Sequence, residues 1–255
     1  MNFDMVTAEF LAVMLGAVRA GAWMLICPPF NSGLIPRRIK VLLSIGLALP
    51  MAPHLRGTVP ALDTSGLIAT AALQVFVGAA LGFITLLLFA AVQAAGDLLD
   101  MASGFTLATV YDPVSANPSS IFGRFYNLVA ITLLFAGDGH QMILRGFMQS
   151  YRTLPLNVSL DGETLSRLML RGAGEMFLAA VQIAGPLVAV LFLADVALGL
   201  LNRVAPALNA FQLGFPVKIF LVVSLAAVAI VSLPTILDSL VDHAVTGVVR
   251  ISGGG

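Results

Sequence analysis

The chain has 255 residues, of which 59% are hydrophobic and 10% charged, against about 25% charged residues in an ordinary soluble domain. Its formal net charge is zero, so composition gives no argument for a nucleic-acid partner or an acidic substrate. The single cysteine, Cys27, excludes an internal disulfide and any multi-cysteine metal site. Composition therefore predicts an integral membrane protein.

Six hydrophobic helical segments are predicted in chain order, at about 8–29, 39–55, 66–97, 121–150, 173–202 and 214–243. Each of the last two contains a charge-free run long enough, at about 1.5 Å per residue, to approach the roughly 30 Å of a hydrocarbon core. The second segment is short and ends in prolines, and the third is longer than a bilayer requires. We therefore expect one all-α membrane domain over 1–255, with helical hairpins that need not be simple up-and-down spans.

The N-terminal segment carries Asp4 and Glu9 instead of the basic region of a secretory signal, and we expect it to be retained. Lysines and arginines are balanced between the two sides of this six-segment topology. Their densest cluster, Arg37, Arg38 and Lys40, follows the first segment. The positive-inside rule therefore favours an N-terminus outside the cytoplasm.

Three charged residues lie within or beside apolar segments: Arg19, Asp195 and Lys218. An arginine in the middle of a span costs about 2.5–3.5 kcal/mol on insertion scales, so Arg19 should face protein or water. One reading is an ion path through a small secondary transporter or ion channel, and the other is helix ends or pairs inside a subunit interface. The second is favoured, because proton-coupled transporters usually bury a carboxylate near the midplane and 64–96 and 219–237 contain none.

The shorter motifs give little evidence for a chemical function. Gly78 and Gly82 form a GxxxG spacing, which allows a second helix to approach closely and is the predicted helix-packing site. Asp138 and His140, in GDGH, have no third or fourth ligand within reach in the sequence, so a turn is predicted there instead of a metal site. No GxSxG, HExxH, Walker A or GxGxxG pattern occurs. The sequence thus gives no support for an enzyme, a metal or a cofactor.

The central stretch GFTLATVYDPVSANPSS, residues 104–120, interrupts the apolar chain. Its second half contains two turn initiators, Asp112-Pro113 and Asn117-Pro118, which would suit a solvated loop. Its first half, 104–111, is more apolar than a surface loop and is expected to be buried. Gly104 and Gly123 are the expected flexible points, because glycine tolerates backbone angles that other residues avoid.

A second region in which prolines interrupt the apolar sequence lies between Pro206 and Pro216. Each proline removes a backbone donor and biases the preceding residue away from helix, so the chain is expected to turn between them. Asn202, Arg203 and Asn209 can satisfy either the backbone groups freed there or the carbonyls of a neighbouring subunit, because an unpaired polar group at membrane depth is costly.

This region, LGLLNRVAPALNAFQLGFPVKI, resembles the family of the flagellar biosynthetic protein FliR. That family carries a similar Asn-Arg-x-x-Pro-x-x-Asn-x-Phe followed by Gly-Phe-Pro and a lysine, matched here by Asn202, Arg203, Pro206, Asn209, Phe211, Gly214, Phe215, Pro216 and Lys218. Blocks at 18–49, 104–120 and 125–156 agree with the family in the same order. One departure is Ala207, where many relatives place a glutamine. Injectisome homologues usually lack the hinge in this form, which favours the flagellar reading.

The resemblance implies a non-enzymatic subunit of the flagellar type III export gate in the bacterial inner membrane, assembled with FliP, FliQ and FlhB around a conduit for unfolded flagellar subunits. It implies a FliP-like part over 1–172, a FliQ-like hairpin over 173–243 and a tail over 244–255. The nine matched residues would form a hinge or subunit interface. The pore plug would comprise Gly104, Phe105, Thr106, Leu107, Val110, Tyr111, Asp112 and Pro113.

Overall fold

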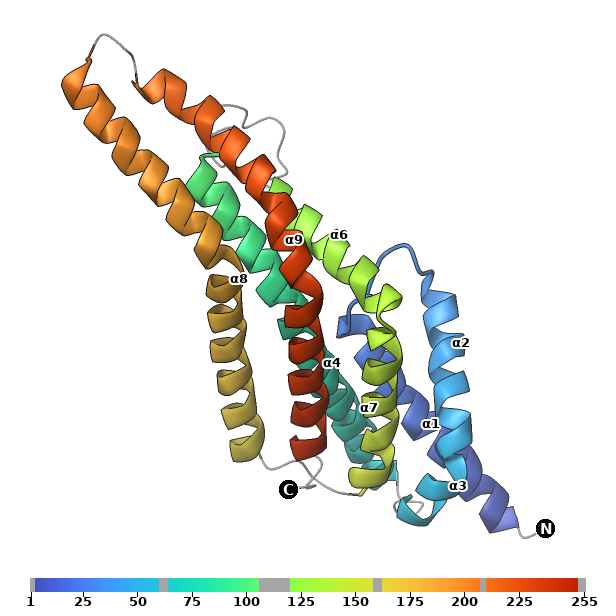
Figure 1. Ribbon diagram of the computed structural model, residues 1–255. Helices are drawn as coiled ribbons and strands as arrows, with labels where there is room; N and C mark the ends of the chain where they lie inside the picture. Colours follow the sequence, from blue (N-terminus) through green and yellow to red (C-terminus); the bar gives the residue numbers. More distant parts are fainter. Residues whose placement is uncertain (1–2, 60–63, 106–119, 158–161, 207–209, 252–255) are drawn as a thin grey trace. The chain divides into compact units, whose positions relative to one another are not determined.

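The computed structural model describes residues 3–59, 64–105, 120–157, 162–206 and 210–251 (Figure 1). Every regular element within these ranges is a helix, and four helices are long and apolar enough to cross a membrane, or five if the bent pair α6–α7 counts as one span. The prediction of an all-α membrane protein is therefore confirmed. The chain divides into two compact units, one of Met1–Leu88, Asp138–Ala173 and Leu240–Gly255, and one of Phe89–Gly137 and Gly174–Ser239.

The first unit is built around α1 (Phe3–Ile26), which packs against α2 (Arg37–Ala48) and α3 (Ala52–Leu55). The buried side chains of α2, Lys40, Ser44 and Ala48, recur every four residues and so form one face of the helix. Gly16 of α1 has no side chain beyond hydrogen, and a Cβ there would lie 3.2 Å from the Cβ of Ala48. Small residues at this contact let the two helices approach closely.

The helix α4 (Thr64–Ser103) crosses α1 at the two glycines of the GxxxG spacing. A Cβ at Gly78 would lie 2.2 Å from the carbonyl oxygen of Arg19, and one at Gly82 would lie 3.0 Å from that of Trp23. Backbone therefore meets backbone at this crossing, and a larger residue at Gly78 would force the helices apart.

The segment predicted as one helix over 121–150 is two helices, α6 (Ile121–Ala136) and α7 (Gly139–Thr153). Gly137 is the C-cap of α6, and Asp138 adopts the left-handed conformation with φ 58°. Aspartate tolerates this conformation better than most residues with a side chain. The predicted turn at GDGH is confirmed, and it separates the apolar helix α6 from α7, which carries Arg145 and Arg152.

The last two helices are α8 (Gly162–Val204) and α9 (Ala210–Ile251). A turn was expected between Pro206 and Pro216, but Pro216 itself lies inside α9. A proline within a helix removes one backbone hydrogen bond, and a long helix retains its other hydrogen bonds on either side. Since α8 ends at Val204 and α9 begins at Ala210, the break between the two helices lies on the Pro206 side of this interval.

Candidate functional site

The last turn of α4 and the first turn of α6 hold the two ends of the central stretch 104–120. Beyond Ser103, Gly104 takes a φ of 87°, the left-handed conformation that commonly ends a helix at glycine. Phe105 follows, and its ring lies 5.8 Å from that of Phe122 in α6. The other six predicted plug residues lie outside the described residues: Thr106, Leu107, Val110, Tyr111, Asp112 and Pro113.

Asp100, which is 1% exposed, joins α4 to the start of α6. Its Oδ2 accepts hydrogen bonds from the hydroxyl of Ser120 and, at 3.0 Å, from the backbone N–H of Phe122. Ser120 in turn caps α6, because its Oγ accepts a hydrogen bond of 2.7 Å from the N–H of Gly123. The first N–H groups of a helix have no partner inside the helix and favour a negative charge. The carboxylate therefore fixes where the central stretch ends and α6 begins.

Gly96 and Gly123 allow the same two helices to touch. A Cβ at Gly96 would lie 2.5 Å from the backbone nitrogen of Gly123, and a Cβ at Gly123 would lie 2.1 Å from Oδ1 of Asp97. Gly123 was expected to be a flexible point, but it lies in the first turn of α6. Its lack of a side chain serves close packing there.

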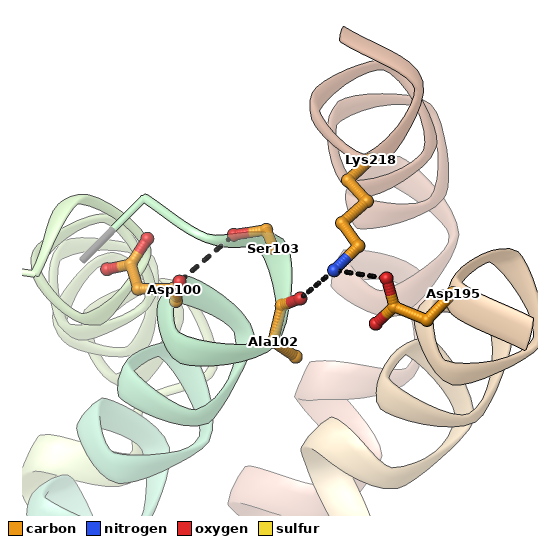
Figure 2. A network of polar contacts seen from close by, with 5 residues as sticks. All are labelled: Asp100, Ala102, Ser103, Asp195 and Lys218. Carbon is orange, nitrogen blue, oxygen red and sulfur yellow. Dashed lines mark hydrogen bonds and ion pairs between the residues drawn. The ribbon is translucent and has the colours of Figure 1, made fainter. Parts of the chain in front are cut away.

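Lys218 of α9 reaches the last turn of α4, as Figure 2 shows. Its Nζ donates a hydrogen bond of 3.3 Å to the carbonyl oxygen of Ala102 and lies 2.5 Å from Oδ1 of Asp195 in α8. In the same turn, the hydroxyl of Ser103 donates to the carbonyl of Asp100 at 3.2 Å. The last carbonyls of a helix lack partners inside it and favour a nearby positive charge. Lys218 therefore caps α4 directly before the central stretch.

Arg19 forms a separate polar cluster in the first unit and is 1% exposed. Its guanidinium donates to Oε1 of Gln74 at 2.7 Å, to the carbonyl of Ser150 at 3.1 Å and to that of Leu154 at 2.8 Å. The guanidinium carbon also lies 4.9 Å from the centre of the Tyr151 ring. The expectation that Arg19 faces protein or water instead of lipid is confirmed.

Each of the three charged side chains in the apolar segments thus has polar partners within its own unit. Arg19 belongs to the first unit, whereas Asp195 and Lys218 pair with each other in the second. Within the described ranges there is no group of three or more histidine, cysteine, aspartate or glutamate side chains that could hold a metal ion.

The predicted hinge residues are distributed over two helices. Asn202 and Arg203 lie exposed in the last turn of α8, next to Val204, which is 84% exposed. Gly214 is buried in α9, where a Cβ would lie 3.4 Å from a methyl group of Leu198. The remaining members are Pro206, which is exposed after α8; Phe211, Phe215, Pro216 and Lys218, which lie in α9; and Asn209, which is outside the described residues.

Sequence reasoning missed Asp100, although a local signal was present. Ser120 precedes a run of apolar residues with helical periodicity, which is typical of an N-cap, and Asp100 lies at the end of the apolar run 64–96 and its DLLD extension. Neither residue by itself indicates that the two meet, because twenty positions separate them in the chain.

Comparison with known proteins gives the family. The profile described as "Bacterial export proteins, family 1" matches residues 10–244. The chain belongs to this family. The flagellar biosynthetic protein FliR of Pectobacterium carotovorum subsp. carotovorum is 32% identical over 203 residues, which cover 79% of this chain and 77% of that protein. FliR of Escherichia coli K12 is 32% identical over 78% of this chain and 77% of its own length, and FliR of Bacillus subtilis 168 is 30% identical over 82% of each.

The resemblance found in the hinge motif is therefore confirmed over most of the chain. Together with the apolar helices, membership of this export family identifies a membrane protein of the flagellar export apparatus. The names of these relatives describe flagellar biosynthesis and not a catalysed reaction.

Proposed function

We propose that this chain is a non-enzymatic subunit of the protein-conducting channel in the flagellar type III export gate of the bacterial inner membrane, and that residues 104–120 are its plug. Family membership supports the export context. The observation that carries the plug assignment is the anchoring of both ends of the stretch, at Ala102 by Lys218 of α9 and at Ser120 and Phe122 by Asp100 of α4.

The apolar first half of the stretch suits a seal, because apolar constrictions exclude water and ions from a pore. The polar second half, with its two Asx-Pro turns, suits the return to α6. Residues 105–111 would therefore close the conduit and residues 112–119 would bring the chain back.

The exposed end of α8 suits a subunit interface. Asn202 and Arg203 are exposed beside Leu200, which is 61% exposed, and Val204. Polar side chains that faced lipid at this position would be costly, whereas a neighbouring helix can supply hydrogen-bond partners. We assign this surface to contact with FliP or FliQ, with FlhB as a further member of the complex and with flagellar export substrates in transit.

The test is co-expression with FliP and FliQ, detergent extraction and native mass measurement, followed by reconstitution into liposomes. Replacing residues 105–111 by a Gly/Ser sequence should leave the mass of the complex unchanged and make the closed gate leak small ions. Leu34→Ser is the matched control, because Leu34 is 92% exposed in a different turn. Unchanged ion permeability would refute the plug.

The same preparation separates this function from its alternative, a small secondary transporter or ion channel that uses Arg19, Asp195 and Lys218. That alternative requires a chain that folds and conducts alone. A monodisperse monomer that conducts ions without FliP or FliQ would overturn the export-gate function.

A further inference from the structure

Three helices of the second unit meet at one ammonium group (Figure 2). Lys218 enters from α9, Asp195 from α8, and the carbonyl of Ala102 from α4. The side chain of Lys218 is 17% exposed, while that of Asp195 is 50% exposed. The lysine is thus mostly enclosed by protein, and its partner reaches it from the edge of the contact.

The two acceptors have different roles in this contact. The carbonyl of Ala102 is one of the terminal carbonyls of α4, and a cation there also interacts favourably with the negative end of the helix. Asp195 compensates the charge of Lys218 and holds Nζ at a defined position, because an ion pair of 2.5 Å restricts an otherwise flexible four-carbon chain. Ala102 lies two residues before Gly104, at which the central stretch begins.

We propose that Lys218, held by Asp195, is a positioning residue of the gate: it fixes the last turn of α4 and so the point from which the plug departs. This inference rests on the proposed function of residues 104–120 as a plug. It assigns separate roles to the two anchors, since Asp100 holds the far end at Ser120 and Lys218 holds the near end. It also couples the α8–α9 hairpin to the plug, because a displacement of α9 withdraws the donor from Ala102.

The test uses the full chain in its complex with FliP and FliQ and measures two quantities. The first is hydrogen exchange of the backbone amides of residues 103–105, and the second is small-ion permeability in liposomes. Lys218→Met should raise exchange at 103–105 by about tenfold or more, as expected for the loss of a hydrogen bond from a charged group. It should also raise permeability, while exchange in α6 beyond Gly123 stays unchanged.

Three further variants separate a cap from a general packing role. Lys218→Arg retains a charged donor and should stay within about threefold of the wild-type chain for both readouts. Asp195→Asn keeps the donor but loses the charge that holds it, and should give an intermediate rise. The exchange of charges, Asp195→Lys with Lys218→Asp, restores an ion pair between α8 and α9 but places a carboxylate beside the carbonyl of Ala102. It should behave like Lys218→Met.

The matched control is Arg167→Gln, which breaks the exposed Glu163–Arg167 ion pair on α8 and should change neither readout. The inference is overturned if Lys218→Met, or Asp195→Asn where Lys218→Met does not assemble, leaves exchange at 103–105 at the wild-type value. Wild-type amide exchange at 103–105 in the double variant Asp195→Lys with Lys218→Asp would overturn it as well. Raised exchange with unchanged permeability would retain the anchor and refute the plug, so the two failures are distinguishable.

Discussion

Removal of the buried guanidinium at Arg19 should loosen the packing of α1 against α4 and α7. In Arg19→Met, three acceptors lose the guanidinium: Oε1 of Gln74 and the carbonyls of Ser150 and Leu154. The carbonyl of Ser150 still accepts a hydrogen bond of 2.9 Å from the N–H of Leu154, so two acceptors are left without a donor. Each costs about 1–3 kcal/mol, the cation–π contact with Tyr151 is lost as well, and the relieved desolvation of the guanidinium offsets part of this sum. We expect a net loss of about 3 kcal/mol in the free energy that keeps this unit closed.

The sole cysteine offers a direct assay. Cys27 is 0% exposed at the end of α1, and its backbone nitrogen would lie 3.3 Å from a Cβ placed on Gly82 of α4. A maleimide therefore reacts only when these helices separate, and its rate measures the population of the open state. A loss of about 3 kcal/mol corresponds to labelling that is about 100-fold faster.

Two companion variants complete this experiment. Arg19→Lys keeps the charge but loses the planar fork that serves three acceptors, so its labelling should be about tenfold faster than wild type. Leu25→Ala, at a position on α1 that is 64% exposed, should label at the wild-type rate. Wild-type labelling of Arg19→Met would refute the conclusion that this cluster holds α1, α4 and α7 together.

Two further substitutions test close contacts within the units. Gly78→Ala places a Cβ 2.2 Å from a carbonyl oxygen of α1 and should lower stability by about 2 kcal/mol, measured as faster labelling of Cys27, whereas Gly46→Ala, with nothing within 4 Å, should not. Equal rates in both variants would contradict the close crossing. Asp100→Asn removes the charge at the start of α6 and should raise exchange of the Phe122 amide about fivefold, for a loss of about 1 kcal/mol. An unchanged amide would show that the carboxylate charge does not hold this helix end.

Local chemistry was sufficient for several features of the candidate site. Gly104 ends α4 in the left-handed conformation, which follows from its lack of a side chain. Ser120 caps α6, as a serine before an apolar periodic run indicates. The motif around Pro206 resembles the family to which the whole chain belongs. Each of these features depends on a few consecutive residues.

Local chemistry was misleading where neighbouring helices decide the outcome. Pro216 looked like the end of a turn but lies within α9, and Gly123 looked flexible but lies where α6 packs against α4. In both cases a local preference is worth about 1–3 kcal/mol, which tertiary packing can outweigh. The break at Asp138 inside the predicted segment 121–150 is different, because the turn predicted at GDGH already indicated it locally.

The sequence by itself determined that this is an all-α membrane protein of the flagellar export family, because apolar composition and short motifs are properties of the linear chain. The tertiary structure decided which polar groups meet. Arg19 bonds to a carbonyl 135 positions away, Lys218 to one 116 positions away, and Asp100 to a hydroxyl 20 positions away. Such pairs depend on which helices become neighbours, and in an apolar environment each buried polar group must find its partner wherever the fold brings one.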